Sequence, residues 1–256
     1  MLRCLDCEFR FYERGLSETE AANLYAHYRS EEYQRERQKD EPFYTEKAHA
    51  GFEAFENSPL RRRSLERKLA ELGIGPLDSA LDYGGADGRL IAELPAKRKA
   101  VYDIAGTPPV EGVEAVRADE LRNDWDLIVC AQTLEHISDP LDLVRRLLAL
   151  VRPGGHLYLE VPAQLWKNKT FAGALRDGVL RLALRHRWLH IALDVYSTAF
   201  RIKAGILPPF GLVPMREHLN FFSAAALEAL ARRAGGEVVD CGDDPLSGIV
   251  AAVRRP

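Results

Sequence analysis

From residue 79 onward, short apolar runs alternate with segments in which apolar residues recur at helical spacing. The first pattern is typical of buried strands, and the second of helices that pack against a sheet. Their alternation predicts β-α-β units and a parallel sheet, so the fold class expected is α/β. A helix is expected over residues 139–151, ended by the Pro-Gly-Gly turn at 153–155. Strands are expected at residues 79–83, 100–104, 113–118, 125–130, 156–161, 237–241 and 249–253.

Residues 17–72 show a different pattern, because they are polar, rich in Glu, Arg and Tyr, and helical in period. Ser17 and Glu20 stand at the spacing of a capping box, which marks a helix start. The Gly and Pro residues of segment 73–76 end the helical pattern. We therefore expect an N-terminal helical extension over residues 1–72 and one α/β domain over residues 73–256.

The most informative stretch is residues 81–90, with the sequence LDYGGADGRL. An apolar run ends in Asp82, a turn of small residues follows, and amphipathic sequence then resumes, which predicts a tight loop between a strand and a helix. Gly84, Gly85 and Gly88 let backbone N–H groups approach a ligand closely and adopt angles that a Cβ would forbid. The loop is therefore expected to hold a ligand, with Asp82 as a charged acceptor beside it.

This loop resembles the D-x-G-x-G-x-G pattern of class I S-adenosylmethionine (SAM) dependent methyltransferases, with Ala86 at the middle glycine position. Two later stretches, WDLIVCAQTLEHISDP and LVRPGGHLYLEVP, are similar to the same family. The resemblance covers residues 79–162 and resumes at residue 217. It implies a Rossmann-like fold with a seven-stranded, mostly parallel sheet and SAM as the cofactor. The glycine spacing differs from the G-x-G-x-x-G of dinucleotide-binding proteins, which counts against NAD.

Ligands of open α/β sheets bind beyond the carboxyl ends of the strands. By the resemblance, Asp103 would accept hydrogen bonds from both ribose hydroxyls, a role that suits a carboxylate. Asp119 matches the position that binds the adenine amino group, and Gln132 follows the fourth expected strand toward the methyl group or the acceptor. The cofactor-binding residues expected are Asp82, Gly84, Gly85, Gly88, Asp103, Asp119 and Gln132.

Two histidines are candidates for the base that takes the acceptor's proton. His136, beside Glu135, is either this base or a structural residue that orients its loop. The pair Glu217-His218 resembles that of sugar-modifying methyltransferases, including nucleotide-sugar C-methyltransferases, in which the histidine is the base. His218 is therefore the first choice, with Glu217 as its partner, and a purely structural role stays open. Methyl transfer from a sulfonium requires no metal, and none is expected.

Cys4-x-x-Cys7 resembles the second knuckle of a zinc ribbon at the N-terminus of sugar C-methyltransferases. Tetrahedral zinc needs four ligands, and Cys130 and Cys241 lie in expected strands. The knuckle is therefore interpreted as a degenerate remnant, with a working metal site as the alternative. The stretch that follows, LYAHYRSEEYQRERQKDEPFY, looks like the substrate-facing helices of such proteins, although a solvated helix face explains it equally well. Its candidates for sugar or phosphate contacts are Tyr28, Arg29, Tyr33, Arg37 and Tyr44.

Residues 163–216 form a basic amphipathic insert, which either covers the acceptor as a lid or packs on its own domain. Its charge fits phosphate groups or an anionic membrane surface that carries a lipid-linked glycan. The net charge of −3 gives no general attraction to nucleic acid. Four cysteines and the lack of a long apolar run indicate a cytoplasmic protein, with contact at the inner membrane face as an option.

The function expected is SAM-dependent methyl transfer to a small or carrier-linked polar acceptor, namely a sugar in cell-surface polysaccharide biosynthesis. A SAM-binding module that has lost catalysis is one alternative, motivated by Ala86 and the incomplete cysteine knuckle. Nucleic-acid methylation is another, suggested only by the basic insert, and it lacks an acceptor motif such as N-P-P-Y.

Overall fold

The structure, a computed structural model, describes residues 2–17, 19–20, 23–24, 30–45, 59–163, 178, 182, 185–204 and 218–256. The chain forms two compact units. The first, called here the sheet unit, comprises Met1–Ala22, Asn57–Gln164 and Glu217–Pro256. The second, called the helical unit, comprises Asn23–Glu56 and Leu165–Arg216.

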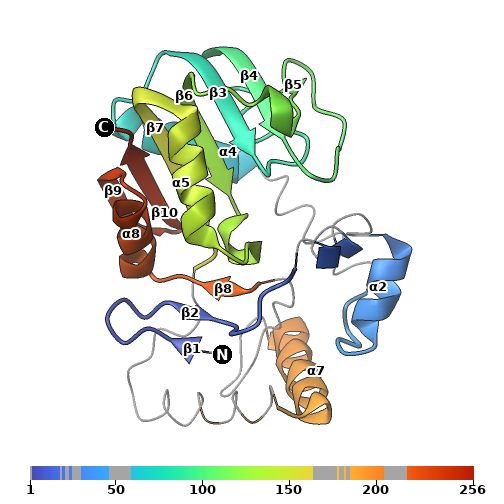
Figure 1. The fold of residues 1–256 in the computed structure, drawn as a ribbon. Coiled ribbons are helices and arrows are strands. Elements are labelled where there is room, and N and C mark those ends of the chain that lie inside the picture. Colours follow the sequence, from blue (N-terminus) through green and yellow to red (C-terminus); the bar gives the residue numbers. More distant parts are fainter. Residues whose placement is uncertain are drawn as a thin grey trace. The chain divides into compact units, whose positions relative to one another are not determined.

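The sheet unit is built on a seven-stranded sheet (Figure 1). Its strands are β3 (Leu77–Tyr83), β4 (Ala96–Tyr102), β5 (Glu114–Ala115), β6 (Trp125–Ala131), β7 (Val151–Val161), β9 (Glu237–Asp244) and β10 (Gly248–Arg254). They lie in the order β5-β4-β3-β6-β7-β10-β9. The strands from β5 to β7 pair in parallel, and β10 is antiparallel to both of its neighbours, β7 and β9. The prediction of seven mostly parallel strands is confirmed.

The central strand β6 is buried along its whole length, because helices cover both faces of the sheet. Successive side chains of a strand point to opposite faces. Ile128 and Cys130 accordingly belong to one apolar cluster, and Leu127 and Val129 belong to another. An uninterrupted apolar run in the sequence is the expected mark of such a strand.

Three helices supply the two apolar layers against the sheet (Figure 1). α5 (Pro140–Leu150) and α8 (Ala224–Arg233) pack on the same face, and α4 (Pro59–Glu71) packs on the other through Leu65 and Leu69. The N-caps of α5 and α8 are Asp139 and Ser223, whose side chains accept hydrogen bonds from backbone N–H groups three residues later. α4 belongs to the sheet unit, although it lies in the expected N-terminal extension. The expected domain boundary at residue 72 stays a prediction.

Several elements differ from the sequence-based expectation. Residues 84–95 form turns, although a helix was expected after the glycine loop. β4 covers Ala96–Tyr102 instead of residues 100–104. β5 contains only two residues, both exposed, where a strand over residues 113–118 was expected. β7 begins at Val151, so the Pro-Gly-Gly segment lies within the strand instead of preceding it. Gly154 and Gly155 exchange backbone hydrogen bonds with Arg255, which extends the pairing between the two chain segments.

A small three-stranded sheet also belongs to the sheet unit. It consists of β1 (Leu2–Arg3), β2 (Arg10–Phe11) and β8 (Asn220–Phe221), all antiparallel. Cys4 and Cys7 lie in the hairpin between β1 and β2. This hairpin is held to the main core because Phe9 packs on Phe222, with ring centroids 4.9 Å apart. After it, Ser17 and Glu20 make the reciprocal hydrogen bonds of the expected capping box.

The helical unit contains α2 (Glu31–Gln38) and α7 (Arg187–Ala204). Arg187 forms an ion pair with Asp40, which follows α2 in the sequence. Polar side chains are buried in this unit, among them Glu41, Asp194 and Ser197. Most of the expected insert 163–216 lies outside the described residues, as do Tyr28 and Arg29. No helix in the described part of the chain has the length and apolar character needed to cross a membrane.

We predict that Asp126→Ala lowers the free energy of unfolding by about 2–3 kcal/mol, because a buried carboxylate then no longer accepts hydrogen bonds. Asp126 accepts from the backbone N–H groups of Asp78 and Ser79 at 2.7 and 2.8 Å and pairs with Arg152. Burial opposes its ionisation, but these partners outweigh burial and lower the pKa of Asp126. The contribution should therefore begin to fall near pH 4 and be lost as the pH falls through the lowered pKa of Asp126.

Urea denaturation at pH 7 and at several pH values below 4 tests this prediction. Asp78→Asn is a matched control, because Asp78 forms only an exposed pair with Lys97 and should change stability by less than about 0.5 kcal/mol. Equal changes in the free energy of unfolding for the two substitutions at pH 7 would contradict the prediction, because the buried hydrogen bonds of Asp126 would then contribute no stability.

Candidate active site

The candidate site lies along one edge of the main sheet, where β3, β4, β6 and β7 end. Because these strands are parallel, their carboxyl ends meet at the same edge. Asp82 is near the end of β3, Asp103 follows β4, and Glu160 is near the end of β7. A 3-10 helix after β6, η2 (Leu134–His136), contains Glu135 and His136.

The glycine loop after β3 folds directly over the carboxylate of Asp82. Asp82 is 1% exposed, and neither of its oxygens has a hydrogen-bond donor among the described residues. A Cβ on Gly85 would stand 2.0 Å from Asp82 Cγ, and a Cβ on Gly84 would stand 2.5 Å from Thr133 Oγ1. Only glycine therefore allows the loop to approach the strand end this closely.

The loop conformation also explains the departure at Ala86. Gly84 and Gly88 adopt φ values of 75° and 74°, in the left-handed region that glycine enters without a steric penalty. Ala86 adopts φ 52°, so it too is left-handed although it has a Cβ. Its backbone N–H donates to Asp103 Oδ2 at 2.9 Å, which holds this conformation in place.

The surroundings of Asp82 oppose ionisation of its carboxyl group. Burial is the largest cause, Arg61 acts in the opposite direction, and Asp103, Glu160 and Asp87 add repulsion; together they raise the pKa of Asp82 to about 7. A cationic ligand over the loop would favour the ionised form. The buried carboxylate without a donor and the small-residue loop above it thus fit SAM, which carries a sulfonium and an ammonium group.

Asp103 is placed beside the glycine loop, as a ribose-binding residue requires. Its Oδ1 accepts from the backbone N–H of Ala105 at 2.8 Å, and its Oδ2 accepts from Ala86. Each carboxylate oxygen has two acceptor positions, so both can still accept from a hydroxyl. The carboxylate is thus oriented by the backbone on both sides of the site.

Gln132 and Asp119 make contacts that the sequence did not suggest. The Gln132 amide donates to Glu160 Oε1 at 3.1 Å and to the backbone oxygen of Ser247 at 3.3 Å. Asp119 lies in a 3-10 helix, η1 (Ala118–Glu120), and is paired with Arg117 on the surface. Their cofactor contacts stay predictions.

Two charged residues of this edge were missed from the sequence. Glu160 is fully buried and accepts from Arg61, on α4, at 2.6 Å. An acid inside the apolar run LYLEV was a usable signal, because a buried carboxylate needs a partner. Nothing in the sequence pointed to Arg61, which lies 99 positions away.

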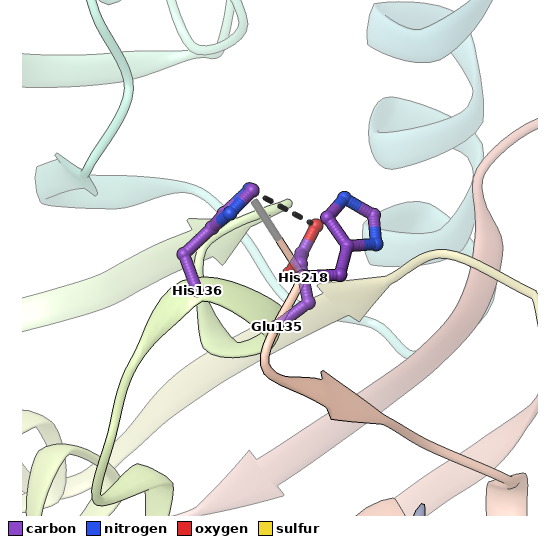
Figure 2. A group of neighbouring side chains, drawn as sticks. All are labelled: Glu135, His136 and His218. Atoms are coloured by element: carbon purple, nitrogen blue, oxygen red, sulfur yellow. Dashed lines mark ion pairs between the residues drawn. The ribbon is translucent and has the colours of Figure 1, made fainter. Parts of the chain in front are cut away.

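A second part of the candidate site contains Glu135, His136 and His218, whose side chains lie beside one another (Figure 2). One donor atom from each residue lies within 4.8 Å of the other two. Glu135 Oε1 is 3.8 Å from His136 Nε2, and the two imidazole rings are 4.8 Å apart at 85°. Glu135 is buried, and both histidines are partly buried. The expected partner Glu217 lies outside the described residues.

Hydrogen bonds fix the segment of His218 against η2. The backbone N–H of Leu219 donates to the backbone oxygen of Glu135 at 2.6 Å. The buried Asn220 amide donates to the backbone oxygens of Leu134 and Ile137 at 3.1 and 2.6 Å. The structure thus brings His218 close to His136, although the two were chosen from separate motifs, and it adds Asn220, to which no motif pointed.

Residues 57–240 match the family described as "Methyltransferase domain". The chain belongs to this methyltransferase family. The match covers strands β3 to β7 and the first half of β9 but not β10, and it includes the glycine loop and both histidines. The expected family, the Rossmann-like methyltransferase fold and SAM as the cofactor of this class are therefore confirmed.

Relatives found in sequence comparison include O-methyltransferases. The chain is 31% identical over 152 residues to the ubiquinone biosynthesis O-methyltransferase of Bordetella avium, covering 56% of this chain and 63% of that protein. The Acinetobacter baylyi protein of the same name is 31% identical over 122 residues, covering 44% of this chain and 50% of that protein. The chain thus spans less than two thirds of the length of both relatives.

One solved structure resembles the chain along its whole length. It is the 1,6-didemethyltoxoflavin-N1-methyltransferase of Burkholderia thailandensis with bound 1,6-didemethyltoxoflavin and S-adenosylhomocysteine. Its identity to this chain is 16%, its TM-score is 0.55, and the match covers all of this chain and 98% of that one. At this identity the likeness supports the fold.

We predict that Gly85→Ala weakens SAM binding at least about tenfold, because the added methyl would overlap Asp82 and force the loop away from it. Isothermal titration with SAM and S-adenosylhomocysteine measures the effect. Gly242→Ala is the matched control, since Gly242 has no atom within 4 Å of the added methyl and lies in β9. Unchanged affinity of the Gly85 variant would place the cofactor away from this loop.

A second prediction concerns the pH dependence of SAM binding. Because the pKa of Asp82 is about 7 and a cation favours its ionised form, affinity should fall more than about tenfold from pH 7.5 to pH 5.5. Asp82→Asn should bind more weakly at pH 7.5 and show a flatter profile. A profile that is equally steep in the variant would assign the titration to another group.

The same substitution has an opposite effect on folding. The folded-state pKa of Asp82 lies above the ordinary value of 3.8, so ionisation costs stability as the pH rises from about 4 to 7. Without SAM, Asp82→Asn should therefore raise the melting temperature at pH 8 and change it little at pH 4. Thermal unfolding at the two pH values separates this folding effect from the binding effect.

Proposed function

We propose that the protein transfers the methyl group of SAM to a hydroxyl of a polar acceptor, namely a sugar in cell-surface polysaccharide biosynthesis that is linked to a nucleotide or a lipid. The observation that supports this most is the arrangement of one sheet edge. The glycine loop over Asp82 lies after β3, His136 lies after β6, and His218, which precedes β8, lies beside His136.

In the proposed reaction, the acceptor oxygen attacks the methyl carbon in line with the departing sulfur. The bond from sulfur to carbon breaks, the bond from oxygen to carbon forms, and S-adenosylhomocysteine leaves. The acceptor's proton passes to an imidazole, with His218 as the first candidate and His136 as the second. Orientation can contribute about 7–11 kcal/mol, and a positioned base about a hundredfold or more.

SAM would be held by residues that already surround the loop. Gly84, Gly85 and Gly88 would admit its methionine part, and the negative charge of Asp82 would favour its cationic groups. Asp103 would accept from the ribose hydroxyls, and Asp119 would contact the adenine. SAM supplies the electrophilic methyl group, so the protein needs only to orient and deprotonate the acceptor.

The sugar acceptor is supported by the likeness of the Glu217-His218 pair and of the N-terminal segment to sugar methyltransferases. The helical unit adds a polar interior, in which Arg37 lies 3.9 Å over the ring of Tyr44 and contacts Glu41 at 2.9 Å. Its basic α7, which begins at Arg187 with Trp188 67% exposed, suits a phosphate-bearing carrier or the surface of an anionic membrane.

The ubiquinone relatives favour a second acceptor class. Their name states O-methyl transfer in ubiquinone biosynthesis, and their likeness to this chain is stronger in sequence than that of the solved structure. A small aromatic hydroxyl compound is therefore the second candidate acceptor. Radiolabelled SAM, offered with nucleotide sugars in one series and phenolic acceptors in the other, distinguishes the two. SAM binding without transfer to any of them would support a binding module instead.

We predict that His218→Ala spares SAM binding but lowers the methyl-transfer rate about a hundredfold, because the acceptor loses a group that takes its proton. His156→Gln is the control, since His156 lies in the first half of β7 and pairs across the strands with Arg254. Turnover at saturating acceptor is measured from pH 6 to pH 9. A His218 variant as fast as the unmodified protein over this range would exclude His218 as the base.

A further inference from the structure

We propose that Glu135, His136 and His218 bind one divalent transition-metal ion, and that the oxygen of the methyl acceptor is a further ligand of it. The metal site itself depends only on these three side chains. The statement that the acceptor reaches it rests on the proposed function.

The first support is distance. The three donor atoms lie within 4.8 Å of one another, and the Glu135 and His136 donors are 3.8 Å apart. Ligands of a tetrahedral zinc ion, with bonds of about 2.0–2.1 Å, lie roughly 3.3 Å apart. The donors therefore have to approach one another by at most about 1.5 Å to reach coordination distance. Figure 2 shows the three side chains beside one another, from two separate chain segments.

The second support is the rigidity of the two segments that hold the ligands. His218 is 82 positions from His136 in the sequence, yet Leu219 donates to the backbone of Glu135 at 2.6 Å. The Asn220 amide bridges Leu134 and Ile137, on either side of the first two ligands. The backbone on both sides of the donors is thus fixed without a metal, which lowers the ordering cost of binding one.

The third support is the set of donors. Two imidazoles and one carboxylate form the protein ligands of hydrolytic zinc sites, and they leave a coordination position open. Imidazole nitrogens favour Zn²⁺, Co²⁺ or Fe²⁺ over Mg²⁺ and Ca²⁺, which prefer oxygen ligands. Among the described residues, this is the one group of three or more such side chains, so Cys4 and Cys7 do not form a competing site of this size.

Metal binding changes how the acceptor would lose its proton. A neutral imidazole has one free lone pair, which either accepts a proton or binds a metal. In the metal-bound protein, the acceptor hydroxyl is acidified by coordination, its proton leaves to water, and the oxygen then attacks the methyl carbon. The histidine base described above would operate only in the metal-free protein. The two forms differ in their response to a chelator.

Cobalt titration tests the site directly. Protein dialysed against a chelator is titrated with Co²⁺, whose visible absorption reports imidazole and carboxylate ligation. We expect one ion per chain, displaced by Zn²⁺, and affinity lowered at least about tenfold in Glu135→Gln, His136→Ala and His218→Ala. The controls His156→Gln and Cys4→Ser/Cys7→Ser should bind as the unmodified protein does. Absence of stoichiometric binding, or equal affinity in the three site variants, would overturn the proposal.

Two further measurements separate this proposal from the proposed function. SAM titration of each variant and of the chelated protein shows whether the fold and the cofactor site remain intact, and Glu135→Asp replaces Glu135→Gln if the latter does not fold. Methyl transfer that stops in chelator and returns with Zn²⁺ or Co²⁺, while SAM binding persists, supports coordination of the acceptor. Full methyl transfer in the chelated protein would overturn that part and leave the histidine base in place.

Discussion

The burial of the Asp82 carboxylate beneath its own loop is the constraint on which the rest of the sheet edge depends. A carboxylate without a hydrogen-bond donor is costly in the interior, and its neighbours Asp103, Glu160 and Asp87 add to the cost. Arg61 is the nearby positive charge, and it is also engaged by Glu160. The edge is therefore electrostatically unfavourable until positive charge is added. A protein that must bind a sulfonium and later release a neutral sulfide can use this difference.

The loop over Asp82 and the histidine pair are structurally connected. Thr133, at the start of the segment that includes Glu135 and His136, is the side chain that Gly84 approaches. The backbone of the same segment accepts hydrogen bonds from Leu219 and Asn220. Movement of the glycine loop would therefore be transmitted to the histidine pair through Thr133. The glycine loop and the histidine pair thus belong to one continuous set of packed segments.

The features that could be predicted from the sequence are those that depend on neighbouring residues in the chain. The extent of β6 was predicted to within one residue, because a fully buried strand has an uninterrupted apolar run. The predicted start of β7, residue 156, was wrong. Gly154 and Gly155 belong to the strand because they pair with Arg255, about a hundred residues later. His136 and His218 were each chosen from local motifs, but their proximity depends on contacts between segments 82 positions apart. One sequence contains no direct record of such pairings, so the converging donors and the pair of Arg61 and Glu160 emerged only with the fold.

The division of the helical unit into two distant segments has a consequence for synthesis. Residues 23–56 leave the ribosome early, but their structural partners at 165–216 follow only after the first five strands of the main sheet. At the usual rate of translation, this delay is on the order of 10 s. Glu41, buried in the finished unit, must stay hydrated during that interval. The polar composition of residues 23–56 favours their hydration during this interval. A nascent chain halted after β7 would contain this segment without residues 165–216, the second half of its unit.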